Sequence, residues 1–320
     1  TPNRMVNLIE HQSTDVDDQA KALAGWHQHY EQLGCGGFSG SVWQLVMADG
    51  LLIRESTNRK LREQICPPTN HLVLAIPLSV MEGSVFAGRP LNRDSLMVLS
   101  GNNEYDVVSA GDLDLIGLSI HSDTLGQALA PEKMAWVERA QKRGHLDLPP
   151  EIAGAIRHML MAVCTDAEAQ IDHLSTEGHG AELLASTVSQ TVLLAMASEG
   201  DMGASAIPRR ADTRMRVVKR AVEFIRANLH NDIGVPEICS AACASRRTLQ
   251  YCFEEFMLTT PQAYLRALRL NEARRALKRQ TDVPITSVAH ELGFGSASNF
   301  TRHYKMMFDE LPSETLKFNC

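Results

Sequence analysis

Residues 285–312 read ITSVAHELGFGSASNFTRHYKMMFDELP, and this stretch decides how the rest of the chain is interpreted. Its first apolar residues recur at the i, i+3, i+4, i+7 spacing of an amphipathic helix: Ile285, Val288, Ala289 and Leu292. Gly293 favours a turn with positive φ, and Ser296 is a suitable N-cap for a second helix. Together they predict a helix-turn-helix, whose second helix fits the major groove of DNA.

The same arrangement occurs earlier in the chain, offset by about 50 residues. The first apolar spacing is repeated by Val235, Ile238, Cys239 and Ala242. After the turn, the residues that match Phe300, Tyr304 and Pro312 are Leu249, Phe253 and Pro261. Residues 261–278, between the copies, predict a connecting helix about 27 Å long. The second helix of each motif, which enters the major groove, is called a reading helix below. One turn of DNA is about 34 Å, so two reading helices joined by the connecting helix fit successive major grooves.

Many residues of this tandem repeat fit the pattern of one family: Ser245, Leu249, Phe253, Pro261, Tyr264, Arg269, Leu270, Ala273, Ile285, Ala289, Gly293, Phe294, Ser298, Phe300, Arg302, Tyr304, Lys305 and Pro312. Residues 213–317, about a third of the chain, resemble the DNA-binding domain of the AraC/XylS transcription regulators. Three positions that are usually Gly in that family are occupied by Cys243, Leu258 and Asp309. These departures suggest altered turns, because side chains disfavour left-handed backbone.

The resemblance implies which residues meet DNA. The base-contacting positions of the family are occupied by Arg247, Gln250 and Tyr251 in the first reading helix and by Ser298, Asn299 and Arg302 in the second. Arg pairs best with guanine, and Gln or Asn with adenine. The residues that flank these faces, and are expected to contact phosphates, are Arg246, His303 and Lys305. Arg269 is expected to make a structural ion pair or a phosphate contact, and Arg274 and Arg275 to be solvated.

The N-terminal half changes from a predicted helix at 14–33 to short strands. The predicted strands are 41–47, 51–56, 71–76, 84–86, 95–100, 105–108 and 113–120. This spacing suggests a sandwich or small barrel, and the resemblance implies a cupin-like barrel at about 38–121. The half is also similar to the ethanolamine-utilisation regulators of the family at 14–16, 26–33, 37–40, 54–55 and 76–77. That likeness does not identify a ligand for this chain, because no motif marks the residues of a pocket.

Helical periodicity returns at 131–143, 150–164 and 182–197. In the family such helices form a dimer seam, and the alternative is a second core layer within one chain. Residues 199–212, rich in Gly, Ala, Ser and Pro, predict a linker. The expected fold is α+β, with an effector-binding and dimerisation domain at 1–198 and an all-α DNA-binding domain of two helix-turn-helix motifs at 213–320.

Charge is divided unevenly along the chain. The 320 residues carry a net charge of −7, yet from Arg209 onward there are 18 Lys and Arg against 12 Asp and Glu. A basic C-terminal module on an acidic N-terminal one is suited to phosphate binding by one part only. The sequence has no apolar run of membrane length and no apolar signal core, which predicts a cytoplasmic protein. Its seven cysteines show no CxxC pair and are expected to be reduced.

These features favour a sequence-specific transcription regulator, an activator by family resemblance, over an enzyme. A cupin metal site needs about three His and a Glu, but the strand region offers only His71 and His121, and no GxSxG is present. No cofactor or metal is expected. The expected partners are double-stranded promoter DNA, RNA polymerase, a small-molecule effector and a second copy of the chain, without a membrane. The effector pocket is expected at Trp43, Leu45, Ile76 and Phe86, unless the barrel is solid and serves only for dimerisation.

Overall fold

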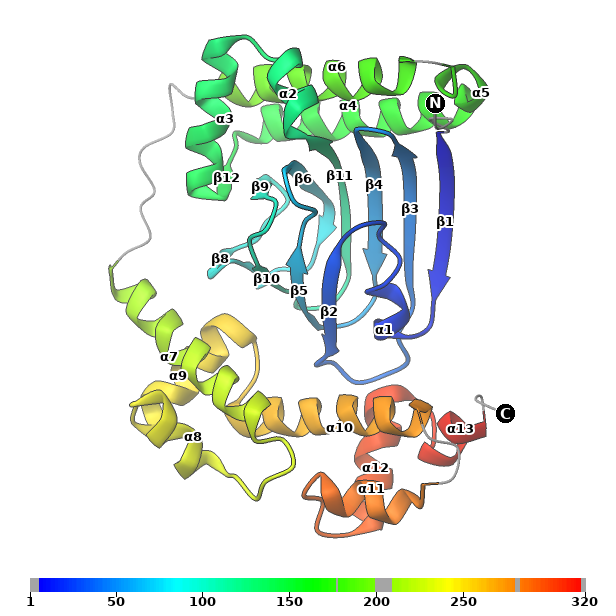
Figure 1. Cartoon of the computed structure of the whole chain (residues 1–320). Helices are drawn as coiled ribbons and strands as arrows, with labels where there is room; N and C mark the ends of the chain where they lie inside the picture. Colours follow the sequence, from blue (N-terminus) through cyan, green and yellow to red (C-terminus); the bar gives the residue numbers. More distant parts are fainter. Residues whose placement is uncertain (1–5, 177, 199–208, 280–282, 318–320) are drawn as a thin grey trace.

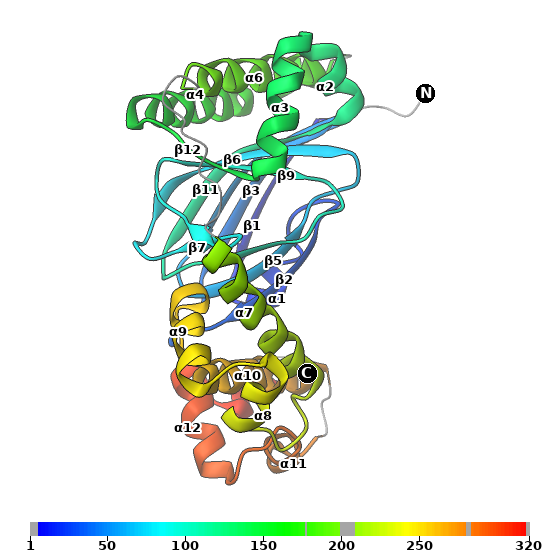
Figure 2. The same cartoon turned by 90° about the vertical axis from the view of Figure 1, so that its left-hand side faces the viewer.

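The computed structural model describes residues 6–176, 178–198, 209–279 and 283–317 (Figure 1). These residues form three tiers: a layer of helices, a pair of β-sheets, and a C-terminal domain made of helices. Figure 2 shows the same order of tiers from the side, with the sheets in the middle. The mixed α and β architecture expected from the sequence is therefore confirmed.

The strands in the described part of the chain form two antiparallel sheets. The larger sheet has the order β1 (Asn7–Ser13), β3 (Gly40–Met47), β4 (Gly50–Thr57), β11 (Leu113–His121), β6 (His71–Val80), β9 (Ser95–Ser100) and β12 (His145–Asp147). The smaller sheet has the order β2 (His27–Gln32), β5 (Leu61–Cys66), β10 (Tyr105–Val108), β7 (Val85–Phe86) and β8 (Arg89–Pro90). In the smaller sheet β5 pairs with β2, so that Tyr30 lies opposite Glu63 and Glu31 opposite Arg62.

Both faces of the larger sheet are buried at its central strands. In β6, Leu72 and Leu74 pack on the helical layer, whereas Val73 packs between the two sheets. Side chains of a strand alternate between the two faces, so a strand that is buried on both needs apolar residues at nearly every position. This explains the continuous apolar run of residues 72–76. The space between the sheets is the interior of a barrel-like domain.

The outer face of the larger sheet is covered by α2 (Ser122–Ala128), α3 (Pro131–Arg143), α4 (Pro150–Ala169), α5 (Ile171–Leu174) and α6 (His179–Met196). Trp136, Ile156 and Val188 are fully buried in the core that these helices share with the sheet. Each such side chain contributes roughly 1.5–3 kcal/mol of burial energy. The periodicity that predicted helices at 131–143, 150–164 and 182–197 is therefore explained, at least on the inner side of these helices, by burial against the larger sheet.

The C-terminal domain holds α7 (Arg209–Ala227), α8 (Val235–Ala242), α9 (Arg246–Met257), α10 (Pro261–Arg279), α11 (Ile285–Glu291), α12 (Ala297–Phe308) and α13 (Pro312–Lys317). Helices α8 and α9 form the first helix-turn-helix, and α11 and α12 form the second. Figure 1 shows the two units at opposite ends of α10. Each unit has its own core, one around Phe253, which it shares with α7 and α10, and one around Phe300, which it shares with α10.

The three non-glycine residues at the family's glycine positions keep the left-handed backbone. Cys243 has a φ of 51°, Leu258 of 55° and Asp309 of 58°, and each caps the C-terminus of a helix. The sequence suggested altered turns here, and the backbone shows none at these positions. The left-handed conformation costs a non-glycine residue roughly 1–2 kcal/mol, which the surrounding helix packing must offset. Gly293 has a φ of 72°, as predicted.

The structure corrects one prediction in the N-terminal half. Residues 14–33 do not form one helix: α1 spans only Val16–Gln19, and the segment continues through Gly25, with a φ of 77°, into strand β2. Pairing of β2 with β5 outweighs the helical spacing of the segment, and β5 itself was not predicted. Helix α7 begins at Arg209, and the rest of the predicted linker, residues 199–208, lies outside the described residues.

The described residues include no helix that is both long enough and apolar enough to span a membrane.

Candidate nucleic-acid interface

The first reading helix, α9, exposes the side chains that the sequence assigned to DNA. Ser245 caps it, with its Oγ accepting a hydrogen bond from the Thr248 backbone N–H at 3.1 Å. Leu249 is buried, whereas Arg246 and Arg247 are exposed and Gln250 is half-exposed. Tyr251 is 54% exposed, which is unusual for so large an aromatic side chain. The helix therefore presents a cationic and aromatic surface away from its core.

The second reading helix, α12, presents a similar surface. Ser296 caps it by accepting from the Asn299 backbone N–H at 3.2 Å. Ser298, Asn299, Arg302 and Lys305 are exposed. The Arg302 Nη2 donates to Asn299 Oδ1 at 2.7 Å, which places these two side chains on one face of the helix. A neighbouring Arg and Asn with fixed geometry are suited to reading adjacent base edges.

A groove of about 550 Å³ separates the two helix-turn-helix units. It is lined on one side by Arg246 and on the other by Asn299 and His303, with Arg266 of α10 at its base. Burial, followed by the charges of Arg266 and Arg302, lowers the pKa of His303. Burial and these two charges therefore favour the neutral imidazole of His303 in the chain without DNA. Arg266, which was not predicted as a DNA contact, is a second exposed cation that lines the groove, beside Arg246.

Arg269 braces the two units instead of facing solvent. Its Nε donates to the Leu229 carbonyl at 3.1 Å and its Nη2 to the Asn231 carbonyl at 2.7 Å. Its guanidinium also lies against Gly293, where an added Cβ would come within 2.9 Å of Nη1. Arg269 thus joins the end of the α7 segment to the turn of the second unit, a structural role that needs neither an ion pair nor a phosphate.

Comparisons with known proteins agree with this arrangement. A helix-turn-helix domain family matches residues 238–317. The chain is 31% identical over 142 residues to the HTH-type transcriptional regulator ArgR of Pseudomonas aeruginosa, covering 44% of this chain and 43% of that protein. It is 35% identical over 101 residues to the XylDLEGF operon transcriptional activator of Pseudomonas putida, and the match covers 31% of this chain and 32% of that protein.

One similar solved structure is the crystal structure of a probable AraC family transcriptional regulator from Rhodopseudomonas palustris. Its sequence is 30% identical to this chain, the match covers 32% of this chain and 96% of that chain, and the TM-score is 0.30. The chain belongs to the AraC family of transcription regulators. This AraC-type chain spans less than half the length of the curated relatives described above. The likeness to them therefore bears chiefly on the DNA-binding domain.

The AraC-type DNA-binding domain is joined to the barrel by a buried group of charged and polar side chains around Glu31. Glu31, which is 3% exposed, pairs with Arg226 of α7 at 2.6 Å, and it accepts a hydrogen bond from the Tyr264 hydroxyl of α10 at 3.1 Å. Arg62 donates to the same hydroxyl at 3.1 Å. Burial alone would raise the pKa of Glu31, but the hydrogen bond from His29 and the charges of Arg226 and Arg62 lower it to about 2.

A second set of ion pairs joins α10 to the segment before β2. Arg274 pairs with Asp15 at 3.1 Å, and Arg275 pairs with Asp17 at 2.9 Å. Arg275 also donates to the Tyr30 carbonyl at 2.9 Å. The expectation that Arg274 and Arg275 are solvated is therefore wrong. Their partners are distant in the sequence, and only folding brings them together.

The second reading helix is itself attached to the barrel. The amide Nε2 of Gln32 donates to the Met307 carbonyl at 2.6 Å, and the Gly36 backbone N–H donates to the Met306 carbonyl at 3.0 Å. Both carbonyls lie in the last turn of α12, where they have no partner within the helix. Asn271 of α10 completes the contact by exchanging two hydrogen bonds with the Gln32 backbone, at 3.1 and 2.9 Å. The barrel thus fixes the orientation of α12.

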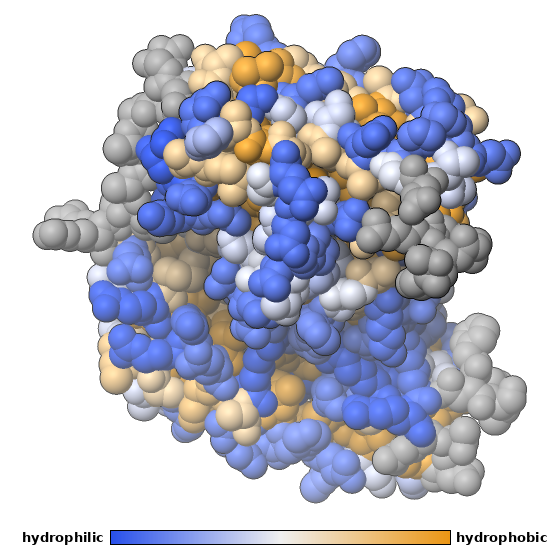
Figure 3. All heavy atoms as spheres, turned by 45° about the horizontal axis from the view of Figure 1, so that its top comes forward, coloured by the Kyte–Doolittle hydropathy of each residue, from blue (hydrophilic) through white to orange (hydrophobic). Residues whose placement is uncertain are grey.

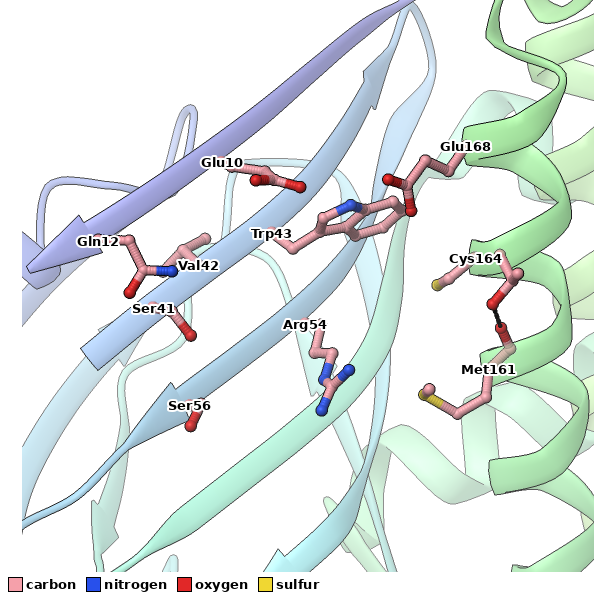
Figure 4. A pocket seen from close by; sticks show the side chains of 11 residues that line it. Glu10, Gln12, Ser41, Val42, Trp43, Arg54, Ser56, Met161, Cys164 and Glu168 are labelled. Atoms are coloured by element: carbon pink, nitrogen blue, oxygen red, sulfur yellow. Dashed lines mark hydrogen bonds between the residues drawn. The ribbon is translucent and has the colours of Figure 1, made fainter. Parts of the chain in front are cut away.

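The four residues expected to line an effector pocket lie in different places. Trp43 lines an open groove of about 360 Å³ between the larger sheet and α4, together with Glu10, Arg54 and Glu168 (Figure 4). Leu45 and Ile76 are fully buried against the helical layer, and Phe86 is buried between the sheets. The structure therefore does not bring the four together around one cavity.

Proposed function

We propose that the chain binds promoter DNA through both helix-turn-helix units and regulates transcription from that promoter. One observation carries this proposal: two capped reading helices with exposed Arg and Asn or Gln side chains lie at opposite ends of one straight helix. The 19 residues of α10 give a rod of about 28 Å. That length is close to one turn of DNA, about 34 Å, so α9 and α12 suit successive major grooves.

Each reading helix takes part in a defined way. We assign base contacts to Arg247, Gln250 and Tyr251 in α9 and to Ser298, Asn299 and Arg302 in α12. We assign phosphate contacts to Arg246, His303 and Lys305, to which we add Arg266. The groove between the units supports the assignments of Arg246, Arg266 and His303, which line it, because DNA whose successive major grooves hold α9 and α12 would pass its backbone between the two units.

We further propose that the barrel controls the DNA-binding domain in response to a small molecule. The ion pairs of Glu31 and the hydrogen bonds of Gln32 support this, because they join barrel strand β2 to α7, α10 and α12. A shift in β2 is then passed to both reading helices. Activation through RNA polymerase is proposed by analogy with the Pseudomonas putida relative, which is named as an operon activator.

We also propose that the helical layer forms a dimer seam. Figure 3 looks onto this layer, where apolar residues are interspersed with polar ones. Leu193 belongs to α6, a helix of this layer, and its side chain is 57% exposed. Sedimentation velocity of the full chain and of a Leu193→Glu variant tests this: the variant should be a monomer at concentrations where the parent is a dimer.

DNA recognition is tested by selecting binding sites for the full chain from a library of random duplexes. We expect enrichment of one sequence, and hydroxyl-radical footprints of two protected tracts about 10 base pairs apart. Affinity should fall steeply with salt, because several Lys and Arg displace counterions from phosphate. Failure to enrich any sequence over random duplex would refute the proposal, and a single protected tract would restrict it to one reading helix.

A further inference from the structure

One side chain outside both helix-turn-helix units lies against the first reading helix, α9, which packs beside α7 (Figure 1). Arg214, in the second turn of α7, places its guanidinium carbon over the ring of Tyr251, 5.6 Å from the ring centroid. A guanidinium within about 6 Å of an aromatic ring is attracted to the face of that ring. Arg214 therefore covers one face of a side chain that we assign to base contact.

Arg214 is itself held in place by an ion pair. Its Nη2 donates to Glu255 Oε1 at 2.8 Å, and its Nε lies 2.8 Å from Glu255 Oε2. This two-point contact fixes the plane of the guanidinium as well as its position. Glu255 follows Tyr251 by four residues, so the two side chains lie one turn apart on the same side of α9. Arg214 thus contacts both of them and joins α7 to the reading helix.

The contact restricts an otherwise mobile side chain. An exposed aromatic residue on a helix has more than one allowed rotamer, and ordering such a side chain on binding costs about two- to tenfold in affinity. A ring that Arg214 already holds loses less freedom when it binds. Tyr251 remains 54% exposed, so the side of the ring away from Arg214 is open to a partner.

We propose that Tyr251 recognises the C5-methyl group of one thymine in the major groove, and that Arg214, anchored by Glu255, positions it for this contact. The inference rests on the proposed DNA binding and names the base feature that one residue of α9 reads. The thymine methyl is the apolar feature on the major-groove edges of the base pairs, and an aromatic ring offers it an apolar surface. Tyr251 is the one aromatic side chain among the residues assigned to base contacts; the others are Arg247, Gln250, Ser298, Asn299 and Arg302.

The place of Arg214 in α7 also connects this contact to the barrel. The next residue, Met215, lies against the turn between β7 and β8, where a Cβ added at Gly88 would come within 2.4 Å of Met215 Cε. The first part of α7 thus rests on the barrel while Arg214 holds Tyr251. A change in how the barrel seats α7 therefore bears directly on a base-reading residue.

The test uses the duplex selected by the full chain, with each thymine replaced in turn by deoxyuridine. This exchange removes one methyl group and leaves the hydrogen-bonding groups of the base in place. Affinity is measured by fluorescence anisotropy. We expect one thymine whose replacement weakens binding about fourfold, the value of one buried methyl group. Tyr251→Ala should abolish the preference for thymine over deoxyuridine at that position.

Three further variants separate positioning from general attraction to DNA. Arg214→Ala and Glu255→Gln should each reduce the thymine preference to less than about twofold, because the ring is no longer held. Glu255→Gln removes no cation, so its effect does not come from lost attraction to phosphate. Arg216→Ala is the matched control: it removes the same charge from the same helix, but Arg216 is exposed and its Nη2 donates to the Thr213 hydroxyl. It should keep the thymine preference of the parent.

A selected duplex in which no exchange of thymine for deoxyuridine changes the affinity would overturn the proposal, and so would a Tyr251→Ala variant that keeps the preference. An undiminished preference in Arg214→Ala, or an equal loss in Arg216→Ala, would reject the positioning role. If Arg214→Ala does not fold, Glu255→Gln decides the same point. A parent chain that selects a site but ignores its methyl groups rejects this inference alone, whereas a chain that enriches no sequence rejects the proposed function.

Discussion

Glu31→Gln should uncouple the DNA-binding domain from the barrel. The substitution keeps the shape of the side chain but removes the charge that faces Arg226 and Arg62. A pKa of about 2, against a usual value of 4.5, corresponds to a contribution on the order of 3 kcal/mol at neutral pH. Arg226 is 29% exposed and keeps some of its hydration, so we expect a net loss of about 2 kcal/mol in the free energy of unfolding.

The pH dependence has a definite sign. Because the folded-state pKa of Glu31 is depressed, its contribution is fully present above pH 4.5 and is lost as the pH falls toward 2. Urea unfolding of the parent and of Glu31→Gln, followed by circular dichroism from pH 7 to pH 3, measures the difference directly. The two should differ most at pH 7 and converge on acidification. Glu10→Gln is the control, since Glu10 is exposed on the outer strand β1.

A constant difference between parent and Glu31→Gln across this pH range would contradict the ion-pair account and point to a packing defect instead. Equal stability at pH 7 would show that the Glu31 interactions contribute nothing net, and the proposed route of control through β2 would then lose its support.

Two further variants test the C-terminal domain. Cys243→Gly should raise the free energy of unfolding by about 0.5–1 kcal/mol in urea titrations, because it relieves left-handed strain. The control Ala241→Gly, inside α8, should lower the free energy of unfolding by about 1 kcal/mol. If both substitutions change the free energy of unfolding in the same direction, Cys243 is not strained. Arg269→Lys should cost about 1–3 kcal/mol, because an ammonium does not reproduce the two-armed contact with the Leu229 and Asn231 carbonyls. The control is Arg279→Lys, a substitution of an exposed residue on the same helix. If Arg269→Lys and Arg279→Lys unfold at the same temperature, Arg269 does not hold the two units together.

The features that follow from local periodicity could be predicted from the sequence. The boundaries of both helix-turn-helix units, the caps at Ser245 and Ser296, and strands such as β9 and β10 are set by residues close in the chain. Strand β2 could not be predicted, because its spacing suits a helix and only its pairing with β5 decides the outcome. For the same reason, no local pattern indicated that Arg274 and Arg275 pair with carboxylates far away in the chain.

The buried carboxyl of Glu63 was missed for a related reason. Glu63 belongs to β5, whose sequence LREQIC alternates so weakly that no strand was predicted there. Without that strand, nothing placed a carboxyl at residue 63 opposite Glu55 inside a barrel. The apolar residues proposed instead, such as Leu45 and Ile76, were correctly assigned to buried strand positions, but they face the helical layer. Periodicity identifies a buried face without saying which of two cores receives it.

The central claim is that α12 reads bases in the major groove, and comparison of Arg302→Ala with Lys305→Ala tests it most directly. Both side chains are exposed cations on α12, but only Arg302 is hydrogen-bonded to Asn299 on the proposed reading face. Binding of each variant to the selected site and to its single-base substitutions should be measured by fluorescence anisotropy at several salt concentrations. Arg302→Ala should cost about 1–3 kcal/mol and relax preference at one base pair. Lys305→Ala should weaken all duplexes alike and reduce the salt slope by about 1. If Arg302→Ala weakens every duplex equally, α12 does not read bases through this face.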